Sequence, residues 1–225
     1  MKLSELLGDP SWLFDLGFPV HPMQPLGARS AKPDRLEWEL GDAYKIPALS
    51  TLGGERQFAD LSIAWGDEGL FLQVVSQAKE NKPKSSSPPT IFLTFYLDTR
   101  WSPGVHRGTS YCHRFEFIVS RPSTAQLVRG HGELASIQRA RAAPNEIHPK
   151  DISVGCLQGK NGLEIKAFLK GETLTGYEPR EYQELGLFYV INDASVGSQC
   201  MARNRQSPFF EDPSQWCRGK LVQPS

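Results

Sequence analysis

The chain of 225 residues contains 39% hydrophobic and 10% aromatic residues, which is enough apolar material for a packed core and excludes wholesale disorder. Lys plus Arg and Asp plus Glu each number 25, and this zero net charge argues against binding to duplex nucleic acid, which needs a basic surface. No stretch approaches the roughly 20 apolar residues that span a bilayer, so no membrane span is expected.

The first 34 residues are rich in Pro and Gly, and they predict an irregular N-terminal extension packed on a domain of residues 35–225. Lys2 is followed by no continuous apolar core, because Asp9 and Pro10 interrupt the segment. This is not the pattern of a secretory signal. The sequence therefore predicts a cytoplasmic protein, or an extracellular one if a leader is missing from this numbering.

Beyond residue 35, short segments of alternating apolar and polar residues are separated by Gly, Pro and Asp turns. Residues 36–40 begin this pattern, and residues 59–65 and 70–75 follow as a hairpin whose turn uses Gly66 or Gly69. Further strands are expected around residues 91–97, 115–119, 152–156, 163–169, 187–191 and 219–222. The pattern predicts one all-β domain, an antiparallel β-sandwich of the jelly-roll or immunoglobulin-like kind.

The order of these motifs resembles a known family. Residues 60–74 form an aspartate-led strand that ends in Trp65-Gly66-Asp67 and turns into a Gly69-Leu70-Phe71 strand. This hairpin resembles that of the family nine carbohydrate-binding modules and their relatives, and the likeness continues through residues 91–100, 162–167, 187–194 and 212–222. The resemblance implies a non-catalytic β-sandwich that binds a saccharide, often at a chain end, with structural calcium in several members.

Catalysis is not expected, because the sequence contains no Gly-x-Ser-x-Gly nucleophile elbow and no recognisable pair of catalytic carboxylates. If the chain were an enzyme, the resemblance would point to a hydrolase acting on glycosidic bonds. The four cysteines form no Cys-x-x-Cys pair, so a structural zinc site is not expected. We expect all four to be free thiols.

Candidate ligand-binding residues lie in the loops and at strand ends. An aromatic ring offers a flat apolar face to the C–H face of a pyranose, and guanidinium groups donate paired hydrogen bonds to hydroxyl or acid groups. Several Arg residues favour an acidic saccharide over a neutral one. The predicted binding set has two stacking residues, Trp101 and Tyr111, and four hydrogen-bonding residues, Arg100, His113, Asn192 and Arg203.

Three alternatives stay open at this point. The resemblance implies a second clamping Trp after Asn192-Asp193, but residues 199–204 contain none, which favours a structural or protein-interaction sandwich that has lost the sugar site. His106 and His113 flank Cys112, which leaves open a metal- or haem-dependent protein centred on the two His. No cofactor is otherwise expected, although the resemblance makes Asp98 and Asp193 candidates for structural calcium.

Overall fold

The computed structural model describes residues 17–24, 33–48, 56–76, 91–120, 129–159, 162–193, 196–201 and 208–224. The described residues form strands and short 3-10 turns. The strands are β1 (Gly17–Pro22), β2 (Ala59–Gly66), β3 (Gly69–Ser76), β4 (Ile91–Asp98), β5 (Cys112–Ser120), β6 (Arg129–Ala135), β7 (Ile152–Gly159), β8 (Gly162–Lys170), β9 (Glu184–Asp193), β10 (Gly197–Cys200) and β11 (Cys217–Leu221). The predicted all-β sandwich is confirmed.

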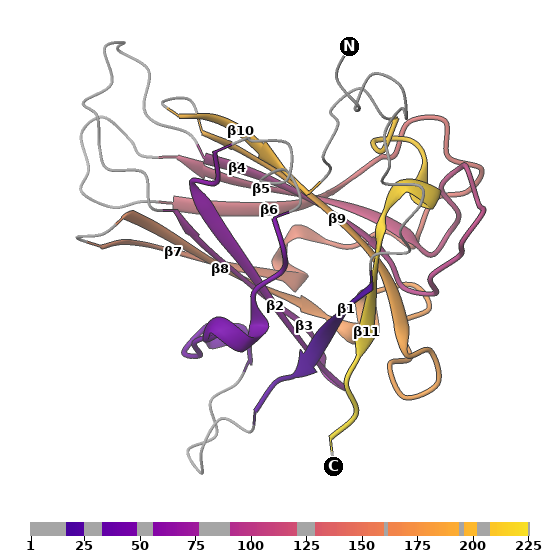
Figure 1. Cartoon of the computed structure of the whole chain (residues 1–225), viewed down its shortest axis with the longest axis horizontal. Coiled ribbons are helices and arrows are strands. Elements are labelled where there is room, and N and C mark those ends of the chain that lie inside the picture. The colour runs from indigo at the N-terminus through magenta and orange to yellow at the C-terminus, as the bar shows by residue number, and fades with distance from the viewer. Residues whose placement is uncertain are drawn as a thin grey trace, which may run out of the picture.

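The strands form two facing layers (Figure 1). One layer runs β6-β5-β4-β9-β11 with β10 paired to β9, and the other runs β2-β3-β8-β7. Strand β1 joins them, because residues 17–20 pair with β11 while His21 and Pro22 pair with β2. Inward-facing residues of both layers fill the core, and Phe95, Phe115 and Leu187 have no exposed surface.

Strand β1 corrects two expectations. Residues 17–22 lie within the segment expected to be irregular, and β1 runs parallel to both of its neighbours in an otherwise antiparallel arrangement. Its first four residues alternate, with Phe18 and Val20 buried and Gly17 and Pro19 exposed. The sequence did not predict this strand because it contains Pro19 and Pro22. Proline cannot donate a hydrogen bond to a sheet ladder and is typical of turns.

The β2–β3 hairpin turns where the sequence predicts, with Gly66 paired to Gly69. Gly69 has φ of 146°, and a Cβ there would lie 2.0 Å from the Leu169 carbonyl oxygen on β8. Only glycine fits this position, so the turn and the approach of β8 depend on the same residue.

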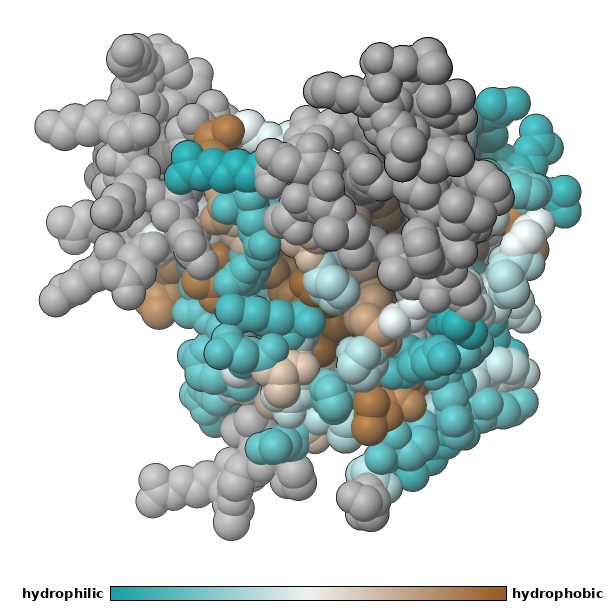
Figure 2. Space-filling model, viewed as in Figure 1, coloured by the Kyte–Doolittle hydropathy of each residue, from teal (hydrophilic) through white to brown (hydrophobic). Residues whose placement is uncertain are grey.

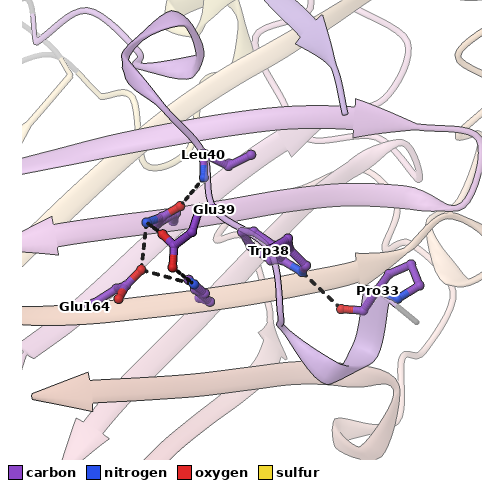
Figure 3. Close-up of polar contacts among 7 residues, drawn as sticks. Pro33, Trp38, Glu39, Leu40 and Glu164 are labelled. Atoms are coloured by element: carbon purple, nitrogen blue, oxygen red, sulfur yellow. Dashed lines mark hydrogen bonds and ion pairs between the residues drawn. The ribbon is translucent and has the colours of Figure 1, made fainter. Parts of the chain in front are cut away.

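A segment that we call the strap, residues 33–45, crosses the outer face of β2, β3 and β8. Residues 36–40 were expected to form a strand, but they have no ladder partner; Trp38 and Leu40 pack instead on Ala64, Phe71 and Phe168. Side-chain bonds replace the ladder, because Leu40 N donates to Gln73 Oε1 at 2.6 Å and Trp38 Nε1 donates to Pro33 O at 3.1 Å (Figure 3).

The space-filling view from the same side shows hydrophilic residues over most of the described rim, with apolar residues gathered between the two layers (Figure 2). All four cysteines are free thiols. Among the described residues there is no helix long and apolar enough to cross a membrane.

Candidate functional site

Arg100 and Tyr111, two of the predicted ligand-binding residues, lie together at the end of β4. The Arg100 guanidinium carbon lies 3.6 Å from the ring centre of Tyr182 and 4.9 Å from that of Tyr111. Its Nε donates to Gly176 O at 3.0 Å, and its Nη2 pairs with Glu178 at 3.1 Å. We call this arrangement the Arg100 clip.

The Arg100 clip fastens the loop after β8 to the loop between β4 and β5. Gly176 has φ of 75°, and a Cβ there would lie 2.5 Å from Tyr111 Cδ1, so the ring and the loop are in close contact. Arg100 uses Nε, Nη2 and its stacking face for contacts within the protein. The geometry gives it a positioning role at the rim.

Trp101 follows directly and lies against the sheet. A Cβ on Gly186 of β9 would lie 3.3 Å from Trp101 Cε3, so the missing side chain makes room for the indole, which is half-buried. The buried Asp98 carboxylate holds this turn by accepting from Arg100 N at 3.0 Å and Ser102 N at 2.9 Å. Both Asp98 oxygens thus serve the turn.

His113 was expected at the binding surface, but it lies in the core. It is fully buried, its Nδ1 lies 3.0 Å from Tyr111 O, and its Nε2 accepts from Thr175 N at 3.1 Å. Burial lowers its pKa to about 4, so the ring is neutral at physiological pH. With both nitrogens bonded within the protein, His113 presents no group to a ligand, and it does not form one metal site with the exposed His106.

The remaining predicted residues do not join the clip. Asn192 pairs with Phe92, whereas Asp98 at the far end of β4 pairs with Gly186. Six residues of strand place these ends roughly 20 Å apart. The calcium candidates Asp98 and Asp193 lie one residue further apart along the strand, because Asp193 pairs with Ile91, and cannot share an ion. Arg203 lies outside the described residues.

Sequence reasoning missed Phe210. Among the described residues, five large apolar side chains are exposed, and Phe210, at 48%, is the aromatic one. It rests on Phe209 with ring centres 4.1 Å apart, and Phe209 stacks on Phe188 of β9 at 4.3 Å. Trp216 Nε1 donates to Phe209 O at 2.8 Å, and this bond holds the backbone at Phe209 in place. The signal was the Phe209-Phe210 pair before the Asp212-Pro213 turn.

Phe210 thus tops an aromatic stack on the outer face of β4 and β9, here called the Phe210 platform; its rings are Phe210, Phe209, Phe188, Tyr96 and Trp216. Beside it on β5, Arg114 lies opposite Tyr96 in register, contacts Glu116 and donates to Ser136 O at 3.0 Å. A rigid apolar ring bordered by a guanidinium and a carboxylate suits a ligand with one apolar face and several hydroxyl groups.

A Ser-His-Asp group borders the platform but lacks the geometry of a catalytic triad. His106 Nδ1 lies 3.1 Å from both Asp212 Oδ2 and Ser214 Oγ, and Ser214 Oγ donates to Asp212 Oδ1 at 2.6 Å. A triad needs the serine and the carboxylate on different ring nitrogens. Here both meet at one nitrogen, and Asp212 also caps the turn by accepting from Ser214 N.

No family model and no curated protein sequence matches the chain. Among solved structures it resembles a carbohydrate-binding module of family 9 from Caldicellulosiruptor kristjanssonii in complex with cellotriose. That alignment has a TM-score of 0.55 and 12% sequence identity, and it covers 93% of this chain and 95% of that chain. A family 9 module from the same organism in complex with glucose aligns with a TM-score of 0.53 and 12% identity over 93% and 97% of the two chains.

The chain therefore has the β-sandwich fold of the family nine carbohydrate-binding modules. The resemblance inferred from the order of the sequence motifs is confirmed at the level of the fold. At 12% identity, what the chain binds has to be argued from its own residues.

Proposed function

We propose that this chain is a non-catalytic saccharide-binding protein whose binding face is the Phe210 platform. The exposed Phe210 ring, held in place by Phe209 beneath it, is the observation that carries the proposal. The two similar structures, solved with cellotriose and with glucose, support saccharide as the ligand class.

In this proposal a pyranose lays its C–H face on Phe210, and its hydroxyl groups meet polar side chains at the edge of the platform. Glu116 and Glu211 supply acceptors, and Arg114 supplies donors. The stack is built before the ligand arrives, so little side-chain entropy is lost on binding.

Trp101, Arg100 and Tyr111 then hold the neighbouring loops in place and do not stack on the sugar themselves. This assignment separates the platform from the binding set expected from the sequence, and the two sites are distinguishable by mutation. Loss of binding in Tyr111→Ala with Phe210→Ala unaffected would move the site to the Arg100 clip.

Calorimetric titration with cellotriose and glucose, together with a glycan array, tests the proposal. We expect Phe210→Ala to weaken binding by about tenfold or more, because one stacking face is lost, and Phe210→Trp to retain it. Leu157→Ala on β7 is the matched control, since it removes another exposed apolar side chain, 64% exposed, from the opposite layer of the sandwich. Absence of saccharide binding at millimolar ligand would leave the structural or protein-interaction alternative in its place.

A further inference from the structure

Two loops at the edge of the Phe210 platform form one continuous surface. They are residues 99–111 between β4 and β5 and residues 136–148 after β6. Gly108 O accepts from Arg141 N at 2.7 Å, and a Cβ on the buried Gly108 would lie 3.1 Å from Ala140 Cβ. The close approach at Gly108 brings the side chains of both loops onto the same corner of the molecule.

This corner is rich in cations although the chain as a whole is neutral. The residues, here called the two-loop basic patch, are His106, Arg107, Arg139 and Arg141. All four are exposed, with the side chains of His106 and Arg139 at 72% and 70%. Figure 2 shows hydrophilic residues crowding the described part of this edge, where the segment before β11 meets the loops in Figure 1.

Acidic partners tie the two-loop basic patch to the platform. Arg139 Nη1 pairs with Glu211 at 3.3 Å, and His106 Nδ1 pairs with Asp212 at 3.1 Å. Glu211 and Asp212 directly follow Phe210, and both donate their backbone N–H to Pro208 O, which keeps the segment compact. His106 and Arg139 therefore each contact a residue that directly follows the exposed ring in sequence.

The charges of the patch do not cancel within the described residues. Glu211 pairs with Arg139, Asp212 contacts the His106 ring, and among the parts of the chain that the structure describes Arg107 and Arg141 have no ion-pair partner. Exposed guanidinium groups with no carboxylate of their own attract carboxylate and sulfate groups, which they bind through paired hydrogen bonds.

We propose that the ligand of the Phe210 platform is an anionic saccharide, one that carries a carboxylate or sulfate group beside the ring that stacks on Phe210. The inference rests on the proposed function and adds the charge of the ligand to it. The sugar ring lies on Phe210, and its acid group points to Arg107 and Arg141 of the two-loop basic patch. A neutral saccharide makes the stacking contact alone.

The test compares ligands that differ in charge and share their ring. Calorimetry at low salt uses an oligogalacturonate, its methyl ester, and a sulfated and an unsulfated form of one neutral oligosaccharide. We expect each acid form to bind about tenfold more tightly than its neutral counterpart, with the difference shrinking as salt rises. The acid form that binds more tightly distinguishes carboxylate from sulfate.

Variants locate the charge effect. We expect Arg107→Gln/Arg141→Gln to remove the preference for the acid form and to leave the methyl ester unaffected, whereas Phe210→Ala weakens both. Arg56→Gln, which removes an exposed cation before β2, is the matched control and should change neither. Circular dichroism of each variant reports that the sandwich is folded.

The outcomes separate the two proposals. Equal binding of acid and ester, both lost in Phe210→Ala, overturns the anionic ligand and keeps the proposed function. A preference for the acid form that persists in Arg107→Gln/Arg141→Gln also overturns the inference. So does binding of the acid forms and of a single-stranded oligonucleotide alike that does not depend on Phe210. No binding of any saccharide removes the proposed function and the inference with it.

Discussion

The Gln199 side-chain amide pairs with the backbone of Ala59 on both sides, in the manner of a strand. Its Oε1 accepts from Ala59 N at 3.1 Å, and its Nε2 donates to Ala59 O at 2.8 Å. The same Oε1 accepts from Phe58 N at 2.9 Å. Because Gln199 belongs to β10 and Ala59 begins β2, one buried side chain links the two layers of the sandwich.

Gln199→Leu is therefore expected to destabilise the fold by about 2–4 kcal/mol, because it removes the acceptor of the buried Phe58 and Ala59 N–H groups. Chemical unfolding followed by fluorescence measures the loss. Gln138→Leu, at an exposed position, is the matched control and should change the free energy of unfolding very little. A loss below about 1 kcal/mol in Gln199→Leu would show that water replaces the amide.

His113 gives the fold a dependence on pH. Burial lowers its pKa to about 4 from an ordinary value of 6.5, so the unfolded chain binds the proton more readily than the folded one. Stability is complete above pH 6.5 and falls as the pH drops towards 4, by up to about 3 kcal/mol from this group. We expect His113→Gln to flatten the pH dependence of the free energy of unfolding in this window.

The slope with pH is the quantity to compare, since His113→Gln also alters the hydrogen bonds to Tyr111 and Thr175. His131→Gln, an exposed histidine on β6, serves as the control and should keep the wild-type slope. An unchanged slope in His113→Gln would contradict the assignment of a buried neutral imidazole.

The Arg100 clip predicts that lysine cannot replace arginine at this position. Arg100→Lys keeps the charge but loses the planar stack on Tyr182 and the bond from Nε to Gly176 O. We expect a loss of about 1 kcal/mol and faster amide hydrogen exchange across residues 175–182. Arg180→Lys, in an exposed pair with Asp67, is the control, and equal exchange in both variants would mean that the clip does not restrain the loop.

The strap is expected to loosen in acid. Burial raises the pKa of Glu39, but hydrogen bonds from Lys166 and Gln73 outweigh this effect and hold the pKa below its ordinary value of 4.5 (Figure 3). This contribution is present above pH 4.5 and is lost as the pH falls through the lowered value. Hydrogen exchange of the Leu40 amide, corrected for its intrinsic rate, should then accelerate as the pH falls. Glu39→Gln should remove this dependence on pH. Glu37→Gln, at an exposed position, is the control and should keep it.

The strands that alternate strictly were predictable from the sequence, and those held by irregular contacts were not. The sequences of β2, β3 and β4 alternate, and a glycine turn joins β2 to β3, which is the pattern expected of strands. Trp38 and Leu40 show the same alternation, but they pack on the outer face of the layer formed by β2, β3 and β8. They do not pair with a neighbouring strand. Periodicity reports which residues are buried and not what covers them.

The candidate site was harder to predict for a related reason. Arg100 and Tyr111 do meet, yet their partners Tyr182 and Gly176 lie more than sixty residues away, so no local pattern shows that the guanidinium is already used. His113 alternates into the core although its residue type suggested the surface. Phe210 shows the reverse error, since an apolar side chain suggests a core position until the stack beneath it is known.

The pairing of β1 with β11 has a consequence for biosynthesis. Gly17 lies beside Arg218, and Val222 N donates to Val20 O at 2.9 Å, so partners roughly 200 residues apart must meet to close the sheet. A chain emerging from the ribosome holds an uncovered β1 edge throughout translation and can complete its fold only once residue 221 has been released. Until then the unpaired edge of β1 can pair with another nascent copy, which is a route to aggregation during synthesis.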